Sequence, residues 1–154
     1  KVDPLQPRFT QNGDGTVTDT YSGLVWLKDA NCSEFLGGVI WSLANTMVGG
    51  LSNGYCGLTD GSNPGDWRIP TVDETQALQC GEYIDPCLCN TSGNGQASNG
   101  DPFTNVQFGS THFYWTSTPG PNPNSRTLEK FDTTAIAAHG DETFPQFVWP
   151  VRNP

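Results

Sequence analysis

Residues 54–78 constrain the fold of this chain more than any other segment, because they join a turn-rich loop to a clearly marked helix start. Pro70 has no backbone N–H and biases Ile69 toward an extended conformation, so we expect the chain to be strand-like up to Ile69. Thr71 and Glu74 then have the spacing of a capping box, in which each side chain accepts a hydrogen bond from the other residue's amide. The sequence therefore predicts a short helix that follows Thr71 and runs to Leu78.

A second helix is predicted over residues 40–48, where apolar side chains recur at spacings of three and four. The residues expected on its buried face are Ile40, Trp41, Leu43, Ala44, Met47 and Val48. The Gly49-Gly50 pair that follows favours the end of the helix. Tryptophans lie within apolar or motif segments throughout the chain and are expected to be structural: Trp26, Trp41, Trp67, Trp115 and Trp149.

Short runs of strand-forming residues predict the β-structure. Residues 9–19 are typical of a hairpin, because Asn12 to Gly15 supply the turn between two such runs. The apolar run in residues 21–27 predicts a central strand. Further strands are expected at residues 113–118 and 147–151, with a hairpin between 127–131 and 134–138 across residues 132–133.

The turn at residues 12–15 also suggests calcium, since Asn12, Asp14 and Gly15 match inner positions of an EF-hand loop. Thr10 and Tyr21 would then occupy the first and last ligand positions, where the loop requires carboxylates. The sequence therefore favours a plain turn, and calcium is not supported by the motif.

Composition narrows the class of protein. The net charge of −9, from 16 acidic and 7 basic residues, argues against nucleic acid as a partner. No apolar run is long enough to span a bilayer, and no leader opens the chain, so we expect no membrane insertion. The 18 glycines, 12 prolines and five cysteines are typical of a loop-rich protein from an oxidising, extracellular compartment. The odd number of cysteines leaves one thiol free or bound to another molecule.

The order of motifs along the chain resembles a known bacterial domain. The residues that match are 8–32, Trp41, 56–74, 113–118 and 148–152. They resemble the DUF1566 domain, which forms the C-terminal part of the Legionella collagen-like adhesin (an Lcl C-terminal-like domain). The resemblance implies a single domain over residues 1–154. Residues 1–7 would be an extended lead-in, and residues 79–101, a cysteine-rich loop, would be an insertion that departs from the family pattern.

Residues 66–71 before the predicted helix are similar to a segment of formylglycine-generating enzymes and of the variable proteins of diversity-generating retroelements. This more distant resemblance implies an α+β, C-type-lectin-like fold. Such a fold would have two short helices flanking a small, twisted, mostly antiparallel sheet, with the termini close together and long loops on one side.

The resemblance also implies a disulfide between Cys32 and Cys56, which would stabilise the fold by about 3 kcal/mol. Cys80 would then pair with Cys87 or Cys89, because Cys87 and Cys89 are too close in sequence to bridge each other comfortably. The sequence leaves this choice open, together with the fate of the fifth cysteine.

No catalytic constellation stands out. His112 and His139 are the only histidines, and no serine lies in a Gly-x-Ser-x-Gly elbow. The spacing of Cys80, Cys87 and Cys89 matches no common zinc pattern. The oxidase chemistry of formylglycine-generating enzymes requires a reactive cysteine pair late in the fold, where this chain has none. We therefore expect no enzyme activity, no cofactor and no metal.

The sequence thus predicts an extracellular, non-enzymatic binding or assembly module of a bacterial surface or secreted protein. Its partner would be a glycan or a protein, or further copies in a homo-oligomer or fibre. The alternatives are a ligand-display protein of a diversity-generating retroelement and, less favoured, a formylglycine-generating-type oxidase. Polar residues in the late loops are the candidate ligand-binding residues: Asn122, Asn124, Arg126, Glu129, Lys130, Asp132, His139, Asp141 and Glu142.

Overall fold

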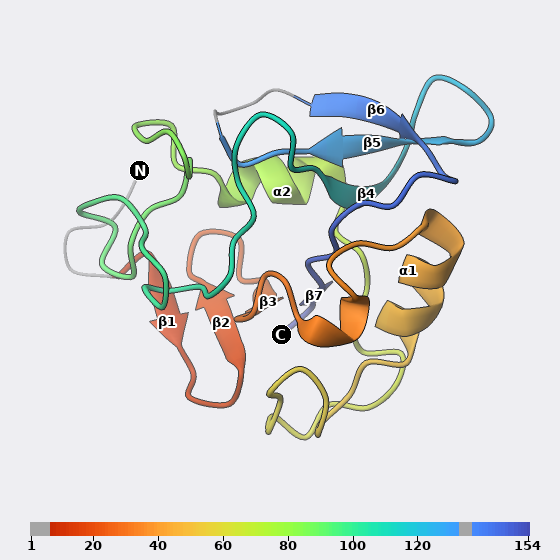
Figure 1. Ribbon diagram of the computed structural model, residues 1–154. Coiled ribbons are helices and arrows are strands. Elements are labelled where there is room, and N and C mark those ends of the chain that lie inside the picture. Colours follow the sequence, from red (N-terminus) through yellow and green to blue (C-terminus); the bar gives the residue numbers. More distant parts are fainter. Residues whose placement is uncertain (1–6, 133–136) are drawn as a thin grey trace.

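Two antiparallel sheets and two α-helices make up the fold (Figure 1). The computed structural model describes residues 7–132 and 137–154. The first sheet has the order β1 (Phe9–Gln11), β2 (Thr16–Asp19), β3 (Val25–Leu27), β7 (Val151–Arg152), and the second has the order β4 (Tyr114–Pro119), β5 (Ser125–Glu129), β6 (Ala137–Asp141). The predicted α+β class with two helices is confirmed, but the strands form two sheets where one was expected. All but the last residue of the expected lead-in lies outside the described residues.

The first sheet grows from the predicted hairpin, with Phe9 opposite Asp19. Its turn is closed by Asp14, whose Oδ1 accepts from the Thr16 amide at 3.1 Å. Gly15 is required there: its φ is +86°, and a Cβ would lie 2.5 Å from the Gly57 carbonyl oxygen. The carboxylate of Asp14 thus serves the turn itself, as a plain turn requires.

β3 is central, between β2 and β7, as predicted. The last strand is shorter than expected, because only Val151–Arg152 joins the sheet. Pro150 just before it has no amide to donate, although its carbonyl accepts from the Leu27 amide at 3.1 Å. Arg68 pairs with Val151 on the outer side of β7, so the extended approach to Ile69 is also confirmed.

The second sheet contains the hairpin predicted for residues 127–138, in a different register. Leu128 lies opposite Ala138, whereas a two-residue turn at 132–133 would place it opposite residue 137. Residues 133–136, which the prediction assigned to the turn and to the start of the second strand, lie outside the described residues.

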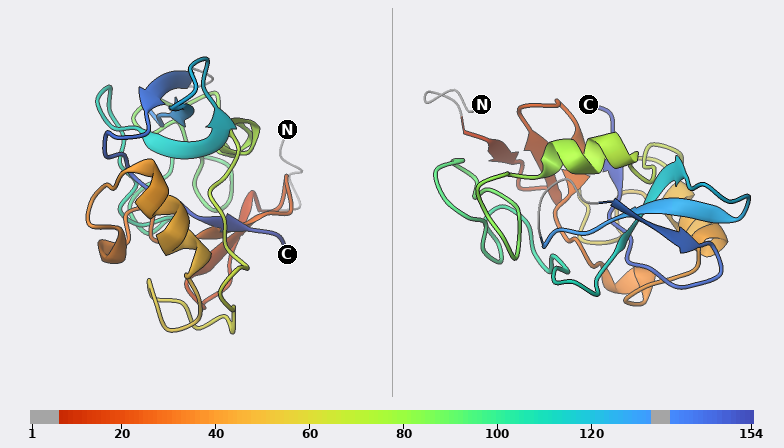
Figure 2. Two further views of the ribbon diagram at one scale, coloured as in Figure 1. Left: turned by 90° about the vertical axis from the view of Figure 1, so that its right-hand side faces the viewer. Right: turned by 90° about the horizontal axis from the view of Figure 1, so that it is seen from above.

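Helix α2 (Val72–Leu78) begins at the predicted capping box. The Glu74 amide donates to Thr71 Oγ1 at 3.2 Å, and the Thr71 amide donates to Glu74 Oε1 at 2.8 Å. The helix lies between the two sheets, against β4 and β5 on one side (Figure 2). Its last carbonyls, Ala77 O and Leu78 O, accept from Arg8 Nη2 at 3.0 and 3.3 Å, so a cation lies at the negative end of the helix dipole.

Helix α1 (Trp41–Gly49) follows a 3₁₀ turn at Ser33–Phe35, and most of its predicted buried face packs on the core, with Trp41, Ala44 and Val48 buried. Trp41 is buried, and its ring packs edge-on against Trp115 with centroids 5.4 Å apart. Ile40 precedes the helix as its N-cap and is 40% exposed, and Leu43 is 43% exposed. The anchoring of the large indole therefore sets the rotation of the helix and turns these two predicted core residues outward.

The core is aromatic, and all five tryptophans are buried as predicted. Trp149 lies at its centre, with ring centroids 4.8 Å from Phe103, 5.2 Å from Phe131 and 5.4 Å from Trp26. Its indole N–H donates to the Leu27 carbonyl at 2.8 Å, which ties the end of the chain to the first sheet. In residues 7–132 and 137–154, no helix has the length and apolar character needed to cross a membrane.

Candidate functional site

Four of the nine predicted ligand-binding residues meet at one end of the second sheet. Asn122 and Asn124 lie in the turn between β4 and β5, and His139 and Asp141 lie on β6. The β5–β6 register, with Ser125 opposite Asp141, brings the turn and the strand together. They line a shallow hollow of about 290 Å³, which we call the hairpin hollow.

Arg126 and Glu142 lie beside the hairpin hollow but interact with each other. Arg126 Nε donates to Glu142 Oε2 at 2.8 Å, and its Nη1 donates to the Ser117 carbonyl at 3.0 Å. The guanidinium also lies 4.3 Å from the centroid of the Trp41 ring, in a cation–π contact. This side chain therefore holds the hairpin against α1.

The other three predicted residues lie at the far end of β5. Glu129 is completely buried, so it does not belong to an exposed patch as expected. Its Oε1 accepts from Gln79 Nε2 at 3.1 Å, and burial raises its pKa to about 7. Lys130 pairs with the buried Asp132 at 3.4 Å. The prediction placed residues 122–142 on one surface. The fold separates its nine candidate residues into the hairpin hollow, the Arg126–Glu142 pair and the group at the far end of β5.

A larger hollow lies where no ligand-binding residue was predicted. Its volume is about 330 Å³, and we call it the loop groove. All its lining residues come from the segment between α2 and β4: Asp85, Pro86, Gln96, Ala97, Ser98, Asn99, Phe103, Asn105, Val106 and Phe108. The one sequence signal for this site was the length of a loop that carries cysteines, since such loops are either functional or stapled.

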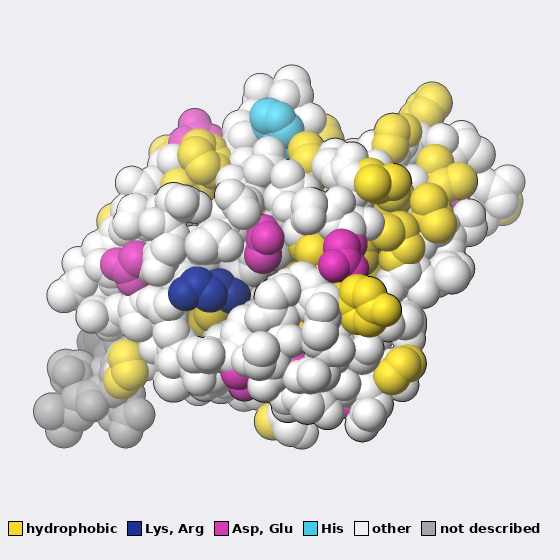
Figure 3. All heavy atoms as spheres, turned by 60° about the horizontal axis from the view of Figure 1, so that its bottom comes forward, with side chains coloured by type: hydrophobic (Ala, Val, Ile, Leu, Met, Phe, Trp, Pro, Cys, Tyr) yellow, Lys and Arg dark blue, Asp and Glu magenta, His cyan; other side chains and the backbone are white. Residues whose placement is uncertain are grey.

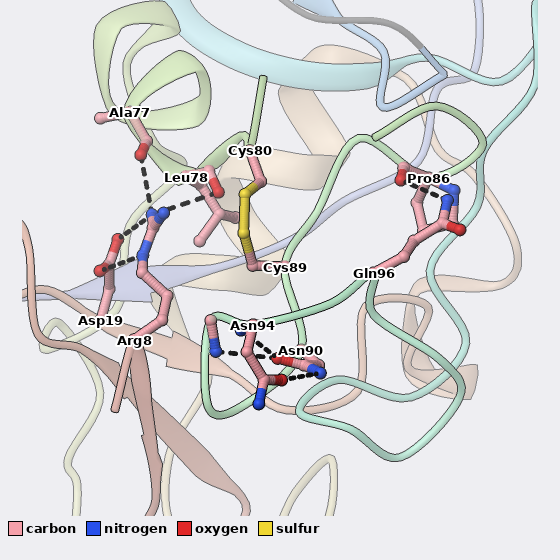
Figure 4. Close-up of a disulfide and its surroundings, with 11 residues drawn as sticks. Arg8, Asp19, Ala77, Leu78, Cys80, Pro86, Cys89, Asn90, Asn94 and Gln96 are labelled. Atoms are coloured by element: carbon pink, nitrogen blue, oxygen red, sulfur yellow. Dashed lines mark hydrogen bonds and ion pairs between the residues drawn. A yellow bond between two sulfur atoms is a disulfide. The ribbon is translucent and has the colours of Figure 1, made fainter. Parts of the chain in front are cut away.

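The first wall of the loop groove is fastened by covalent and polar contacts (Figure 4). The disulfide between Cys80 and Cys89 closes this part of the loop at its base. Gln96 Nε2 donates to the carbonyls of Ile84 and Pro86 at 2.6 and 3.0 Å. These bonds hold the loop segment around Gln96 against the segment at residues 84–86. The wall is therefore formed before any ligand arrives.

Asn105 holds the second wall. Its backbone has a φ of +58°, in the left-handed region that asparagine tolerates better than most residues. Its amide donates to Asn99 Oδ1 at 2.9 Å, and its Nδ2 donates to Asp29 Oδ1 at 3.0 Å. Asn105 thus binds Asn99 through its backbone and the segment that follows β3 through its side chain.

The family model of the Lcl C-terminal domain matches residues 15–152. The chain belongs to the Lcl C-terminal domain family. Searches of the curated proteins and of the solved structures found no match. The resemblance read from the motifs is thereby confirmed at the level of the family, which indicates a module of a surface or secreted protein. Both hollows lie inside the matched part of this Lcl C-terminal domain.

The Lcl C-terminal domain has two disulfides. Cys32 is bonded to Cys56, as the resemblance implied, and Cys80 is bonded to Cys89, which settles the choice that the sequence left open. Cys87 is free and buried, and burial raises its pKa to about 12. A thiol that stays protonated at neutral pH is a poor nucleophile, so Cys87 is suited to packing.

Two groups of side chains have the residue types of metal-binding or catalytic sites. Donor atoms of Cys32, Glu34 and Cys56 lie within 4.8 Å of one another, but both sulfurs are bonded together and offer no thiolate to a metal. His112 Nδ1 lies 2.7 Å from the Phe108 carbonyl oxygen, and His139 is exposed on β6. Across the described residues, neither histidine hydrogen-bonds to a serine, a cysteine or a carboxylate, as a general base would.

Proposed function

We propose that this Lcl C-terminal domain is an extracellular, non-enzymatic recognition module, which binds a glycan or protein ligand for a surface or secreted protein. The observation that carries the proposal is the loop groove, a preformed hollow that combines an exposed aromatic ring with amide side chains. Concave sites with apolar walls and a few placed polar groups are typical of ligand binding. Two disulfides support an oxidising, extracellular setting.

The groups next to the loop groove also support binding without catalysis. The nearby thiol of Cys87 is buried and protonated, and the imidazole of His112 contacts a backbone carbonyl. Neither arrangement activates a nucleophile.

The C-type-lectin-like architecture is part of the same proposal. β1 and β7 belong to the same sheet, with β2 and β3 between them, and the other three strands form a second antiparallel sheet. The long loops then serve as the recognition elements on a rigid scaffold.

The proposal is tested by applying the labelled domain, with its disulfides intact, to arrays of glycans and of extracellular proteins. We expect saturable binding to a limited set of ligands, lost when the same protein is reduced, alkylated and unfolded. Light scattering over a concentration series distinguishes the assembly function, in which copies associate without a ligand. Blank arrays combined with turnover of a small substrate would disprove a recognition function.

A further inference from the structure

We infer that the loop groove binds an uncharged sugar unit, whose ring packs on Phe108 and whose hydroxyls meet the amides of Gln96 and Asn99. This inference rests on the proposed function and names the chemistry of its ligand. Three properties of the groove lead to it: an exposed aromatic ring, amide groups with unused hydrogen-bonding capacity, and a lining without Lys or Arg in the part of the chain that the structure describes.

The apolar part of the loop groove has a rigid floor and an exposed wall. Phe103 is 1% exposed and is fixed by edge-on contacts with Phe9 and Trp149, whose ring centroids lie 5.3 and 4.8 Å away. Phe108, on the wall, is 42% exposed, although burying such a ring is favourable. A sugar ring offers a face of C–H groups that removes this aromatic surface from water.

The polar part is oriented but not saturated. Asn99 uses its Oδ1 to accept from the Asn105 amide, so its Nδ2 donors remain available. Gln96 uses its Nε2 to donate to two carbonyls, so its Oε1 remains available as an acceptor. A sugar hydroxyl both donates and accepts, and so satisfies either group. A purely apolar occupant would cover these amide groups and leave them unpaired, which is unfavourable.

The charge of the site selects a neutral ligand. Among residues 7–132 and 137–154, no Lys or Arg lines the loop groove, whereas Asp85 is on its wall and Asp29 lies behind Asn105. The chain carries a net charge of −9, and Lys and Arg side chains are sparse on the face in Figure 3. Sulfated or carboxylated sugars would therefore meet a repulsive potential. The volume of about 330 Å³ is near the lower end of ligand sites, which suits a short saccharide segment.

Nuclear magnetic resonance titration of the ¹⁵N-labelled, disulfide-intact chain tests the inference. The neutral probes are maltose, cellobiose, lactose and N,N′-diacetylchitobiose, and the anionic probe is a heparin-derived disaccharide. We expect at least one neutral probe to shift amide signals of residues 96–99 and 105–108 in a saturable way. The shifts should be the same at low and high salt, and the anionic probe should cause none there.

Two variants and a matched control locate the site. Phe108→Ala should weaken binding of the neutral probe about tenfold, equivalent to about 1.4 kcal/mol. Asn99→Asp replaces the free donor by a carboxylate of the same shape and should also weaken it. Phe144→Ala is the control, since Phe144 is 63% exposed but lies outside the groove, in the turn after β6. The affinity of Phe144→Ala for the neutral probe should equal that of the wild type. Thermal unfolding of each variant confirms that it is folded.

The inference is overturned if no neutral probe shifts these signals, if the shifts lie elsewhere, or if Phe108→Ala and Asn99→Asp bind like the wild type. Preference for the heparin-derived probe would also overturn it. If the arrays reveal a ligand that the groove variants bind normally, the sugar site is wrong and the recognition function stands. If arrays and titrations are all blank, both proposals fail.

Discussion

Replacing Glu129 by glutamine should make the stability of this domain less dependent on pH. Glu129, the last residue of β5, is completely buried where β5 packs on α2, and among the described residues its Oε2 has no hydrogen-bond partner. Burial penalises the charged form and raises the pKa of this carboxyl from its ordinary 4.5 to about 7. Glutamine has the same shape and cannot ionise.

The size of the effect follows from linkage between protonation and folding. Because the pKa is raised in the folded state, the folded protein holds this proton more tightly than the unfolded chain does. The resulting stability is fully present below about pH 4.5, declines as pH rises, and is lost above about pH 7. The difference between the two pKa values corresponds to about 3 kcal/mol over this interval.

Urea unfolding followed by tryptophan fluorescence, from pH 4.5 to 8, measures this effect. The free energy of unfolding of Glu129→Gln minus that of the wild type should grow by about 3 kcal/mol across the range. Glu82→Gln is the control, because Glu82 is exposed and its removal should leave the pH profile unchanged. A difference for Glu129→Gln that stays constant with pH would refute the assignment of a raised pKa to this residue.

Three further outcomes are expected. Arg8→Ala should destabilise the domain by about 3–5 kcal/mol in thermal or urea unfolding, because it leaves the buried Asp19 without its partner. The double variant Arg8→Met, Asp19→Leu should recover most of this loss. A double variant as unstable as Arg8→Ala would contradict the prediction. Thr71→Ala should cost about 1 kcal/mol through the lost cap of α2, against no change for the exposed Thr111→Ala. Iodoacetamide should modify Cys87 only after denaturation, as peptide mass spectrometry would show, and rapid labelling of the native protein would contradict its burial.

Features that depend on a few neighbouring residues were decided by the sequence alone. The capping box needs only Thr71 and Glu74, and both of its hydrogen bonds form within one helical turn. The turn at residues 12–15 needs backbone conformations that glycine supplies, and it closes the predicted hairpin. The order of such local motifs was also sufficient to indicate the family.

Tertiary structure decided everything that depends on residues far apart in the chain. Gln79 and Glu129 are 50 positions apart and meet only because α2 packs on β5, which buries a carboxylate that the sequence placed on the surface. Asn105 reaches Asp29 across 76 positions, and that contact helps to build the loop groove. Apolar spacing indicated α1 and three of its buried residues, but the packing of Trp41 on Trp115 left the predicted core residue Leu43 exposed. Local pattern fixes backbone conformation and indicates which side chains are apolar enough to be buried. Which polar groups are buried, and which residues pair, follows from long-range packing.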